Sequence, residues 1–470
     1  MNAKRPNVVF ILADDMGYGD PQCYNAESLI PTAHIDRLAS EGVRFTDAHS
    51  GCALCTPTRY GIMTGRCYWR TPKRHSLVMP YEPPVIPEER LTLATIFRES
   101  GYRTGCIGKW HLGLLHRSKK LEGFQRLFTT IEDEIDFSKE IAGGPIDLGF
   151  DYFFGTAGCS TSDAPYCYIR NRHTVAIPTA RTSEQMNAQP GVYPGLMAED
   201  WDQETVDTTF AAEACGFIDR HVREHADKPF FLYYALSAPH IPWLTPKFIR
   251  GTSREGPRGD MNALVDWCVG EVRATLEKNA ILDDTLVVFT SDNGPQKGQN
   301  GHDATGGLRG LKNSPYEGGH RIPFIVRWPG SVASGTTSDD PLSLTDMMAT
   351  FADLLDYDVP ANAGEDSFSV LRSIAGRGKD DPRPCLIADT GWHASEIGNF
   401  SMRRGLMKLV EFNPREDQNG QTRYELYDLV ADPHEKTDLA ASHPADVESL
   451  KQLLDRVRAA RGMRAVQSSR

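Results

Sequence analysis

The chain has 470 residues, of which 40% are hydrophobic and 24% are charged, and it contains 41 glycines and 30 prolines. These proportions exclude a disordered chain, a fibrous protein and a small disulfide-stabilised fold. The 51 Lys and Arg against 63 Asp and Glu give a net charge of −12, which argues against general nucleic-acid binding but not against small anionic substrates. At about 100–200 residues per domain, this length predicts two or three domains, or one large α/β domain with a smaller one attached.

The distribution of apolar residues bears on the compartment of the protein. No apolar run reaches the roughly 18–20 residues that a membrane-spanning helix needs, so we expect no membrane span. The apolar stretch Val8–Ala13 is shorter than a signal-peptide core of about 7–15 residues and ends at Asp14. We therefore expect a cytoplasmic protein, or a periplasmic or secreted one from which a leader has been removed. The ten cysteines show no framework of pairs, so we expect most of them to be buried thiols.

Strand and helix patterns alternate along the first two thirds of the chain. The continuous apolar run Asn7–Ala13 predicts a strand that is buried on both faces. Further strands are predicted at 102–107, 229–237, 285–291 and 323–328, and helices at 32–41, 91–100, 205–225 and 261–279. This alternation predicts an α/β fold with a large, mostly parallel or mixed sheet sandwiched by helices.

The middle and the end of the chain have a different texture. Residues 114–205 are irregular and rich in glycine, proline and aromatic residues, and we interpret them as inserted loops that shape a pocket. One more helix is predicted at 342–357, followed by a linker at 358–384. Short β segments at 385–390, 406–412 and 424–429, then a helix at 445–460, predict a small C-terminal subdomain of antiparallel strands and a helix. We expect a catalytic α/β domain at 1–370 and an α+β subdomain at 385–470.

Polar side chains follow four of the predicted strands. Because the carboxyl ends of parallel strands meet at one edge of a sheet, these side chains are expected to form one ligand site. Taken singly, each has a plainer interpretation as a turn residue, a partly buried histidine or a surface charge. The residues at these strand ends are Asp14, Asp15, Lys109, His111, His240, Asp292 and Asn293.

A short helix is predicted just after Cys55. Thr56 suits the N-cap, the proline after it suits the first helical position, and Gly65 ends the turn. Cys55 would then lie beside backbone N–H groups that favour an anion, with Arg59 about one turn further. Cys55 alone could equally be a structural thiol. Cys52-x-x-Cys55 could also be half a zinc site or a redox pair, although no second Cys-x-x-Cys accompanies it.

The segment Cys55-Thr-Pro-Thr-Arg59, continuing to Thr64-Gly-Arg66, resembles the signature of type I sulfatases, in which Cys-x-Pro-Ser-Arg is followed by Thr-Gly-Arg. This family belongs to the alkaline phosphatase superfamily. Blocks along nearly the whole chain resemble the same family, and together they are far more specific than any one alone. They lie at 7–15, 108–113, 238–240, 291–294, 310–319 and 424–433.

The resemblance implies an alkaline phosphatase-like fold and hydrolysis of a sulfate monoester, either an aryl sulfate or a sulfated carbohydrate, with release of inorganic sulfate. It implies that a formylglycine-generating enzyme converts Cys55 to Cα-formylglycine, whose gem-diol is the nucleophile. Hard oxygen ligands suit Ca²⁺ or Mg²⁺, and the family favours Ca²⁺. By resemblance, the metal ligands are Asp14, Asp15, Cys55, Asp292 and Asn293, and the catalytic residues are Cys55, Arg59, Lys109, His111, His240 and Lys312.

The resemblance also implies individual roles. His111 removes the proton from the second hydroxyl of the gem-diol, and His240 or Lys312 protonates the leaving alcohol. Arg59 and Lys109 hold the diol and the sulfate oxygens.

Two other functions stay open at this point, namely a phosphonate monoester or phosphodiester hydrolase of the same superfamily and a non-catalytic binder of sulfated glycans. The basic loop at 69–75 is either a contact for an anionic saccharide or a solvated loop.

Overall fold

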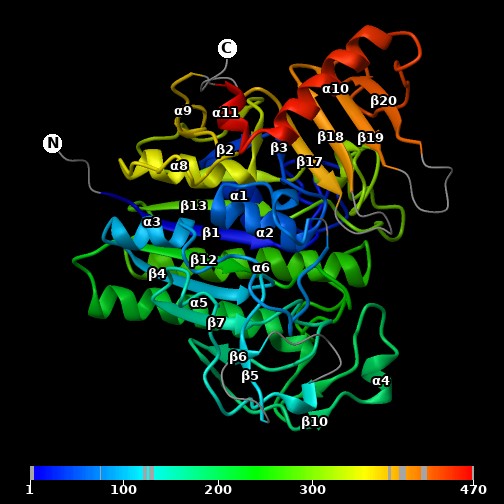
Figure 1. Ribbon diagram of the computed structural model, residues 1–470. Helices are drawn as coiled ribbons and strands as arrows, with labels where there is room; N and C mark the ends of the chain where they lie inside the picture. Colours follow the sequence, from blue (N-terminus) through cyan, green and yellow to red (C-terminus); the bar gives the residue numbers. More distant parts are fainter. Residues whose placement is uncertain are drawn as a thin grey trace.

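The computed structural model describes residues 5–74, 76–119, 124–125, 132–378, 383–390, 398–413 and 421–467. Its centre is a ten-stranded sheet in the order β15-β2-β14-β13-β1-β12-β4-β7-β8-β9 (Figure 1). The five middle strands run parallel, and antiparallel pairs flank them on both sides, so the predicted mostly parallel or mixed sheet is confirmed. The parallel strands are β13 (Thr285–Ser291), β1 (Asn7–Ala13), β12 (Phe230–Ala235), β4 (Arg103–Lys109) and β7 (Tyr152–Thr156).

The outer strands of this sheet are short. On the β13 side they are β14 (Phe324–Arg327), β2 (Val43–Phe45) and β15 (Thr336–Ser338), and on the β7 side they are β8 (Ile169–Arg170) and β9 (His173–Thr174). β14 pairs antiparallel with β13, which the apolar run at 323–328 alone could not show.

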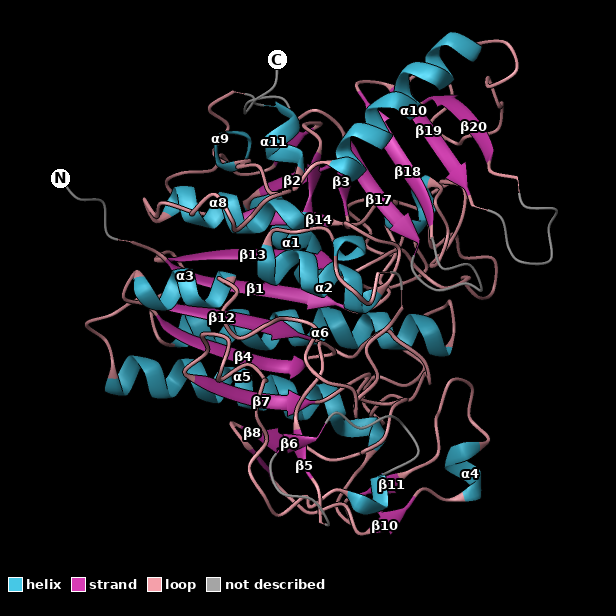
Figure 2. Ribbon diagram, in the orientation of Figure 1, coloured by secondary structure: helices cyan, strands magenta, loops and turns pink. Residues whose placement is uncertain are grey.

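Helices cover both faces of the sheet (Figure 2). Successive side chains of β1 point to opposite faces, and both sets are apolar, so each face needs a layer of helices to bury it. Val8, Phe10 and Leu12 pack in one core with α2 (Cys55–Thr64), α3 (Leu93–Glu99) and α8 (Met347–Leu354). Val9, Ile11 and Ala13 pack in the other with α1 (Ala33–Glu41), α5 (Val206–Glu224) and α6 (Pro257–Lys278). Each such fully buried aliphatic or aromatic side chain contributes about 1.5–3 kcal/mol to folding.

The predicted helix at 342–357 is shorter in the structure. The segment begins with β16 (Leu342–Ser343), continues as a 3-10 turn η4 (Leu344–Asp346) and becomes α-helical only in α8. Ser343 accepts a hydrogen bond from the N–H of Thr345, and the Asp346 carboxylate accepts one from the N–H of Ser343. This reciprocal cap holds the chain extended at 342–343, where β16 pairs with β3 (Ala48–His49).

A separate antiparallel sheet lies near the C-terminus, as predicted, with α10 across it (Figure 1). Four strands form it where three β segments were predicted, because the run Asn399–Arg404 also forms a strand. Its apolar core joins Leu453 and Val457 of α10 to Met402 and Leu409 of the sheet. The elements are β17 (Leu386–Thr390), β18 (Asn399–Arg404), β19 (Met407–Phe412), β20 (Arg423–Asp428), α10 (Pro444–Ala459) and α11 (Met463–Gln467).

The remaining elements are short, and most of them lie in the segment predicted as inserted loops. They are β5 (His116–Arg117), β6 (Phe124–Gln125), β10 (Ala180–Arg181), β11 (Leu196–Met197), α4 (Glu184–Asn187), α7 (Glu317–His320), α9 (Leu371–Ile374) and the 3-10 turns η1 (Tyr68–Arg70), η2 (Glu132–Glu134) and η3 (Gln203–Thr205). Within the described ranges, none of the helices combines the length and apolar character that crossing a membrane requires.

The N-terminus of α1 is capped from another helix. The carboxylate of Asp266, on α6, accepts hydrogen bonds from the N–H groups of His34 at 3.2 Å and Ile35 at 2.8 Å. Asp266 is buried, and burial raises its pKa to about 7. In the unfolded chain the pKa of this Asp is about 3.9. Between about pH 3.9 and pH 7, therefore, Asp266 carries a proton in the folded chain but not in the unfolded chain. This group therefore favours folding most at low pH, and that advantage is lost as the pH rises to about 7.

Replacing Asp266 removes this pH dependence. We expect the melting temperature of Asp266→Asn, measured relative to the wild type by calorimetry, to rise between pH 5 and pH 8, because the amide keeps an acceptor but has no proton to lose. A difference between the two proteins that stays constant over this range would contradict the assignment.

Candidate active site

The parallel register of β1 and β13 brings the two acidic pairs together. Ala13 lies opposite Ser291, so Asp14 and Asp292 leave adjacent strands at the same level. The N–H of Asp292 donates to the carbonyl of Ala13 at 3.0 Å, and the N–H of Asp15 donates to Asp292 Oδ1 at 3.2 Å. The carboxylate oxygens of Asp14, Asp15 and Asp292 lie within 4.8 Å of one another. The predicted convergence of distant strand ends is thus present in the structure.

Two oxygens in this cluster have no partner in the described chain. Asn293 Nδ2 donates to Asp15 Oδ1 at 2.7 Å and to the carbonyl of Gly294 at 2.9 Å, which leaves Asn293 Oδ1 free. Asp14 Oδ1 is also buried without a hydrogen bond. Buried acceptors are nearly always satisfied, so these two oxygens together with three converging carboxylates fit a hard cation.

Three cationic side chains lie against the same carboxylates. Lys109 Nζ donates to Asp14, and Lys312 Nζ lies 2.7 Å from Asp15 Oδ1. The guanidinium of Arg59 donates to Asp292 Oδ2 at 2.8 and 3.1 Å. The three carboxylates and the three cationic side chains have a net charge of zero. A bound divalent ion would therefore make the site positive, which favours an anionic substrate.

The pKa values reflect this mutual pairing. Burial opposes the charge of Asp14, but Lys109 and the other nearby cations hold its pKa well below the usual range. Burial likewise opposes the charge of Lys109, but Asp14 raises the pKa of this lysine well above its ordinary value. Burial, reinforced by Asp14, raises the pKa of Asp292 to about 6. Lys109 is therefore an ammonium ion in the folded protein.

Helix α2 begins at Cys55 and has Leu54 as its N-cap, so the prediction that Thr56 caps the helix is wrong. Thr56 is instead committed to tertiary contacts, since its hydroxyl donates to the carbonyl of His111 at 3.0 Å and accepts from the N–H of Val78 at 3.3 Å. The helix ends, as expected, at Gly65 in the left-handed region. Cys55 thus occupies the first turn, where free N–H groups favour an anion.

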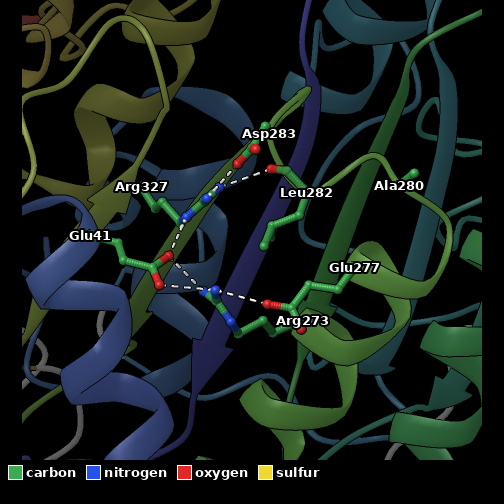
Figure 3. A pocket seen from close by; sticks show the side chains of 7 residues that line it. All are labelled: Glu41, Arg273, Glu277, Ala280, Leu282, Asp283 and Arg327. Atoms are coloured by element: carbon green, nitrogen blue, oxygen red, sulfur yellow. Dashed lines mark hydrogen bonds and ion pairs between the residues drawn. The ribbon is translucent and has the colours of Figure 1, made fainter.

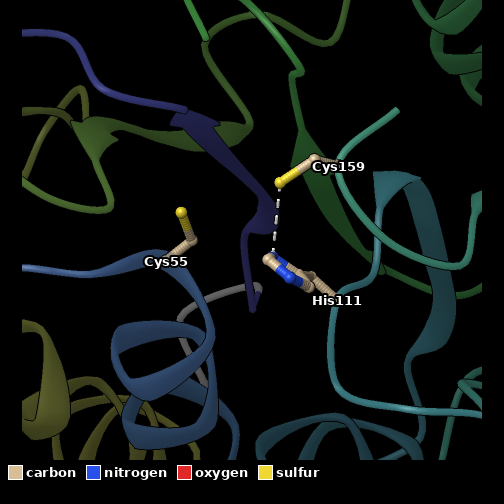
Figure 4. Close-up of side chains that lie close together, drawn as sticks. All are labelled: Cys55, His111 and Cys159. Carbon is tan, nitrogen blue, oxygen red and sulfur yellow. Dashed lines mark hydrogen bonds between the residues drawn. The ribbon is translucent and has the colours of Figure 1, made fainter. Parts of the chain in front are cut away.

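A cysteine that the sequence did not single out lies between the two site histidines. Cys159 Sγ is 3.8 Å from His111 Nδ1 and 3.9 Å from His240 Nε2. Cys159 also forms a group with Cys55 and His111 in which the ligand atoms all lie within 4.8 Å (Figure 4). The residues around Cys159 form no recognisable motif. The one feature of the sequence that pointed to a site role was its position in the segment predicted to shape a pocket.

Backbone strain marks two residues of the site. Asp15 has φ 75° and His111 has φ 59°, both in the left-handed region that non-glycine residues rarely adopt. Such conformations cost of order 1–3 kcal/mol and persist where the surroundings fix them. Hydrogen bonds from Asp15 N–H to Asp292 and from the Thr56 hydroxyl to the His111 carbonyl do so here.

Lys312 reaches the site from a loop held between two segments. Its N–H donates to the carbonyl of Pro295 at 2.8 Å, and the N–H of Asn313 donates to the carbonyl of Ala53 at 3.0 Å. Its side chain donates to Asp15 and lies 3.5 Å from Cys55 Sγ. The structure therefore brings together every residue predicted for the site. They are Asp14, Asp15, Cys55, Arg59, Lys109, His111, His240, Asp292, Asn293 and Lys312.

The basic loop at 69–75 contacts the C-terminal part of the chain. Arg70 forms a bidentate pair with Asp366 and donates to the carbonyls of Val457 and Ala460. Trp69 packs edge-to-face on Phe400. These contacts show a structural role for the first half of the loop, and its last residue, at position 75, lies outside the described residues.

A surface hollow of about 490 Å³ lies away from this site, at the amino end of β13 (Figure 3). Its two arginines are already paired, because Glu41 receives hydrogen bonds from both Arg273 and Arg327. The hollow is lined by Glu41, Arg273, Glu277, Ala280, Leu282, Asp283 and Arg327. It has no nucleophile and stands apart from the carboxylate cluster.

Comparisons with known proteins agree with this geometry. Residues 6–357 match the profile of the family described as Sulfatase, and residues 312–461 match that of N-sulphoglucosamine sulphohydrolase, C-terminal. An N-acetylgalactosamine-6-O-sulfatase of Bacteroides thetaiotaomicron is 31% identical over 97% of this chain and 94% of its own length. Human arylsulfatase A is 32% identical over 96% of this chain and 87% of its own. A solved B. thetaiotaomicron sulfatase, described under the metabolism of multiple glycosaminoglycans, superposes with a TM-score of 0.83 at 29% identity, over 97% of this chain and all of that one.

The fold and the site together define a hydrolase of the alkaline phosphatase superfamily. Within it, the chain belongs to the sulfatase family as a type I sulfatase, a sulfuric ester hydrolase that acts on sulfate esters.

Removing one cation of the site leaves a buried carboxylate uncompensated. We expect Lys109→Met to destabilise the metal-free protein by about 3–5 kcal/mol, because Asp14 then loses its nearest charge partner in a fully buried environment. Thermal unfolding in the presence of a chelator measures this effect. The matched control is Lys278→Met, whose side chain is 70% exposed and should leave the unfolding midpoint nearly unchanged. Equal small effects in both variants would contradict the proposed charge balance.

Proposed function

We propose that this sulfatase removes the sulfate group from a sulfated saccharide, with residue 55 as Cα-formylglycine and Ca²⁺ as the resident cation. The observation that carries the proposal is the position of residue 55. Its Sγ forms one close group with Asp14 and His240, at the first turn of a helix and 3.5 Å from Lys312 Nζ. A saccharide is favoured because the B. thetaiotaomicron relative is an N-acetylgalactosamine-6-O-sulfatase and its coverage is nearly complete.

The donor set fits a hard divalent cation. The oxygens of Asp14, Asp15, Asp292 and Asn293 would hold it, with the side chain of residue 55 as a further ligand. When bound, the cation supplies Lewis acidity and neutralises charge on the sulfate. Ca²⁺ is preferred to Mg²⁺ because the side chains offer several oxygens, whereas Mg²⁺ usually keeps several waters.

The hydrated aldehyde of residue 55 supplies one hydroxyl as the nucleophile and a second through which the product can be released. The chain's own contribution is to hold the anion. Residue 55 begins α2, whose N-terminus favours an anion, and the ammonium groups of Lys109 and Lys312 lie near its side chain. Arg59 lies behind them, fully buried, and fixes Asp292 against the helix.

His111 is suited to accept a proton at Nε2. Burial, together with the charge of Lys109, lowers its pKa, so the imidazole is neutral near pH 7. In the described chain its Nε2 is buried and has no hydrogen-bond partner. This supports the proposed role of His111 as the base for the second hydroxyl of residue 55.

His240 and Lys312 are suited to the leaving-group side. Their side chains are each 11% exposed, whereas those of Asp14, Arg59 and Lys109 are fully buried, so the site opens beside His240 and Lys312. His240 Nδ1 is 2.7 Å from the carbonyl of Ile241, which assigns its proton to Nδ1 and directs Nε2 towards the site. Lys312 is an ammonium ion, because Asp15 outweighs the effect of burial and raises its pKa. Lys312 or His240 is proposed to protonate the departing alcohol.

The function is tested by comparing sulfate release from a 6-O-sulfated amino sugar with hydrolysis of an aryl sulfate and of an aryl phosphonate. We expect sulfate esters to be the better substrates, because the relatives carry sulfatase names. Faster turnover of the phosphonate would support the phosphonate hydrolase alternative. Binding of the saccharide without release of sulfate would support the glycan-binder alternative.

Residue 55 is tested by substitution. We expect Cys55→Ala and Cys55→Ser to lose at least three orders of magnitude in kcat/KM without loss of the fold, because neither side chain forms a hydrated aldehyde. Peptide mass analysis of the wild type should show formylglycine at this position. Cys215→Ala, on α5 and outside the site, is the matched control and should retain activity. Near-normal turnover by Cys55→Ala would contradict the proposed role of residue 55 as the nucleophile.

The cation is tested by removal and return. We expect a chelator to lower activity and Ca²⁺ to restore it, since three buried carboxylates converge on one place. Asp14→Asn should weaken this response by raising the Ca²⁺ concentration that half-restores activity. Full activity after exhaustive chelation, with no bound metal by elemental analysis, would contradict the assignment.

A further inference from the structure

The proposed function leaves one group at its centre unused. It gives Cys159 no role, yet the Cys159 thiol lies beside Cys55 and His111 (Figure 4). His240 Nε2 is 3.9 Å from the same sulfur. The unmodified chain has a cysteine at position 55. In this form, a second thiol and two imidazoles lie close to the Cys159 sulfur.

The spacing around the Cys159 sulfur is close to that of a tetrahedral zinc site. Zinc–sulfur bonds of about 2.3 Å and zinc–nitrogen bonds of about 2.0–2.1 Å at the tetrahedral angle place sulfur and nitrogen about 3.6 Å apart. Cys159 Sγ lies 3.8 Å from His111 Nδ1 and 3.9 Å from His240 Nε2. The Cys55 sulfur lies within 4.8 Å of the ligand atoms of His111 and Cys159.

The surroundings suit a soft cation. Cys55 and His111 are 1% exposed, Cys159 is 6% exposed and the His240 side chain is 11% exposed, so a bound ion would be largely shielded from water. His111 and His240 offer nitrogen ligands at 3.8 and 3.9 Å from the Cys159 sulfur. The charges balance, because two thiolates neutralise one divalent ion.

We propose that the thiol form of this protein binds Zn²⁺ through Cys55, Cys159, His111 and His240, at a site that shares only residue 55 with the hard-cation site of the carboxylates. Each thiol loses its proton to solvent as its sulfur–zinc bond forms, so binding releases two protons and involves no change of oxidation state. Conversion of residue 55 to an aldehyde removes one sulfur ligand and abolishes the site.

Other groupings in the described chain do not offer an equivalent site. The His49–Glu317–His320 group already contains the ammonium of Lys408, 2.9 Å from Glu317 Oε1. The Asp20–Glu255–His302 group is filled in the same way by a buried arginine that pairs with both acids. A positive side chain thus already serves as the cation in both.

The test uses full-length protein in which peptide mass analysis shows a thiol at position 55, kept in a phosphine reductant. Co²⁺ is the spectroscopic probe. We expect a thiolate-to-cobalt absorption band, the release of two protons, and no displacement by excess Ca²⁺, which disfavours sulfur ligands. Cys159→Ser should weaken Co²⁺ binding at least tenfold. Cys52→Ser is the matched control and should bind as the wild type does, although Cys52 shares the Cys-x-x-Cys spacing.

A measurement on the wild type alone guards against variants that fail to fold. Zinc X-ray absorption should show two sulfur and two nitrogen neighbours at about 2.3 and 2.0 Å. A shell of oxygen atoms without sulfur would overturn the proposal, as would loss of binding in Cys52→Ser or unchanged binding in folded Cys159→Ser. None of these readouts uses turnover, so the proposal can fail while the sulfatase function stands, and the reverse also holds.

Discussion

The Arg59 guanidinium connects the parts of the molecule on which the site depends. It is fully buried, and it donates to the carboxylate of Asp292 and to the backbone carbonyl of Lys109, while Asp14 lies 3.5 Å away. Arg59 belongs to α2, so one side chain ties the helix that begins at Cys55 to the ends of β13, β4 and β1. A buried guanidinium without partners is strongly unfavourable. The position of Cys55 and that of the carboxylates are therefore fixed by the same interaction.

The C-terminal sheet supports the same site from another direction. Lys408, on β19, pairs with Glu317 at the start of α7, and Glu435 accepts from the N–H of Glu317. β17 also contacts the segment before α2, where the N–H of Ala53 donates to the carbonyl of Asp389 at 2.8 Å. The segments before Cys55 and after Lys312 thus rest on residues that lie at least 91 positions away in sequence, and the small sheet helps to position the candidate site.

Local pattern predicted much of this arrangement. Strands β1 and β13 were predicted to the residue, because strands buried on both faces are continuous apolar runs that end abruptly at Asp14 and Asp292. The features that were missed depend on distant parts of the chain. The Thr56 hydroxyl bonds to residues 78 and 111 and does not cap its own helix. Cys159 became a site residue only because β4 and β12 place His111 and His240 beside it, and no motif around it could indicate that.

The burial of α2 has a consequence for the order of events in biosynthesis. All ten residues of this helix are buried, and Cys55 itself is 1% exposed, so the active site of another protein cannot close around it once the fold is complete. The segment before it is covered by Asp389, which the ribosome adds more than three hundred residues later. If residue 55 is the formylglycine proposed above, the maturation enzyme can reach it only between the emergence of the cysteine and the docking of the last sheet. Under that proposal, the speed of folding competes with the yield of mature enzyme.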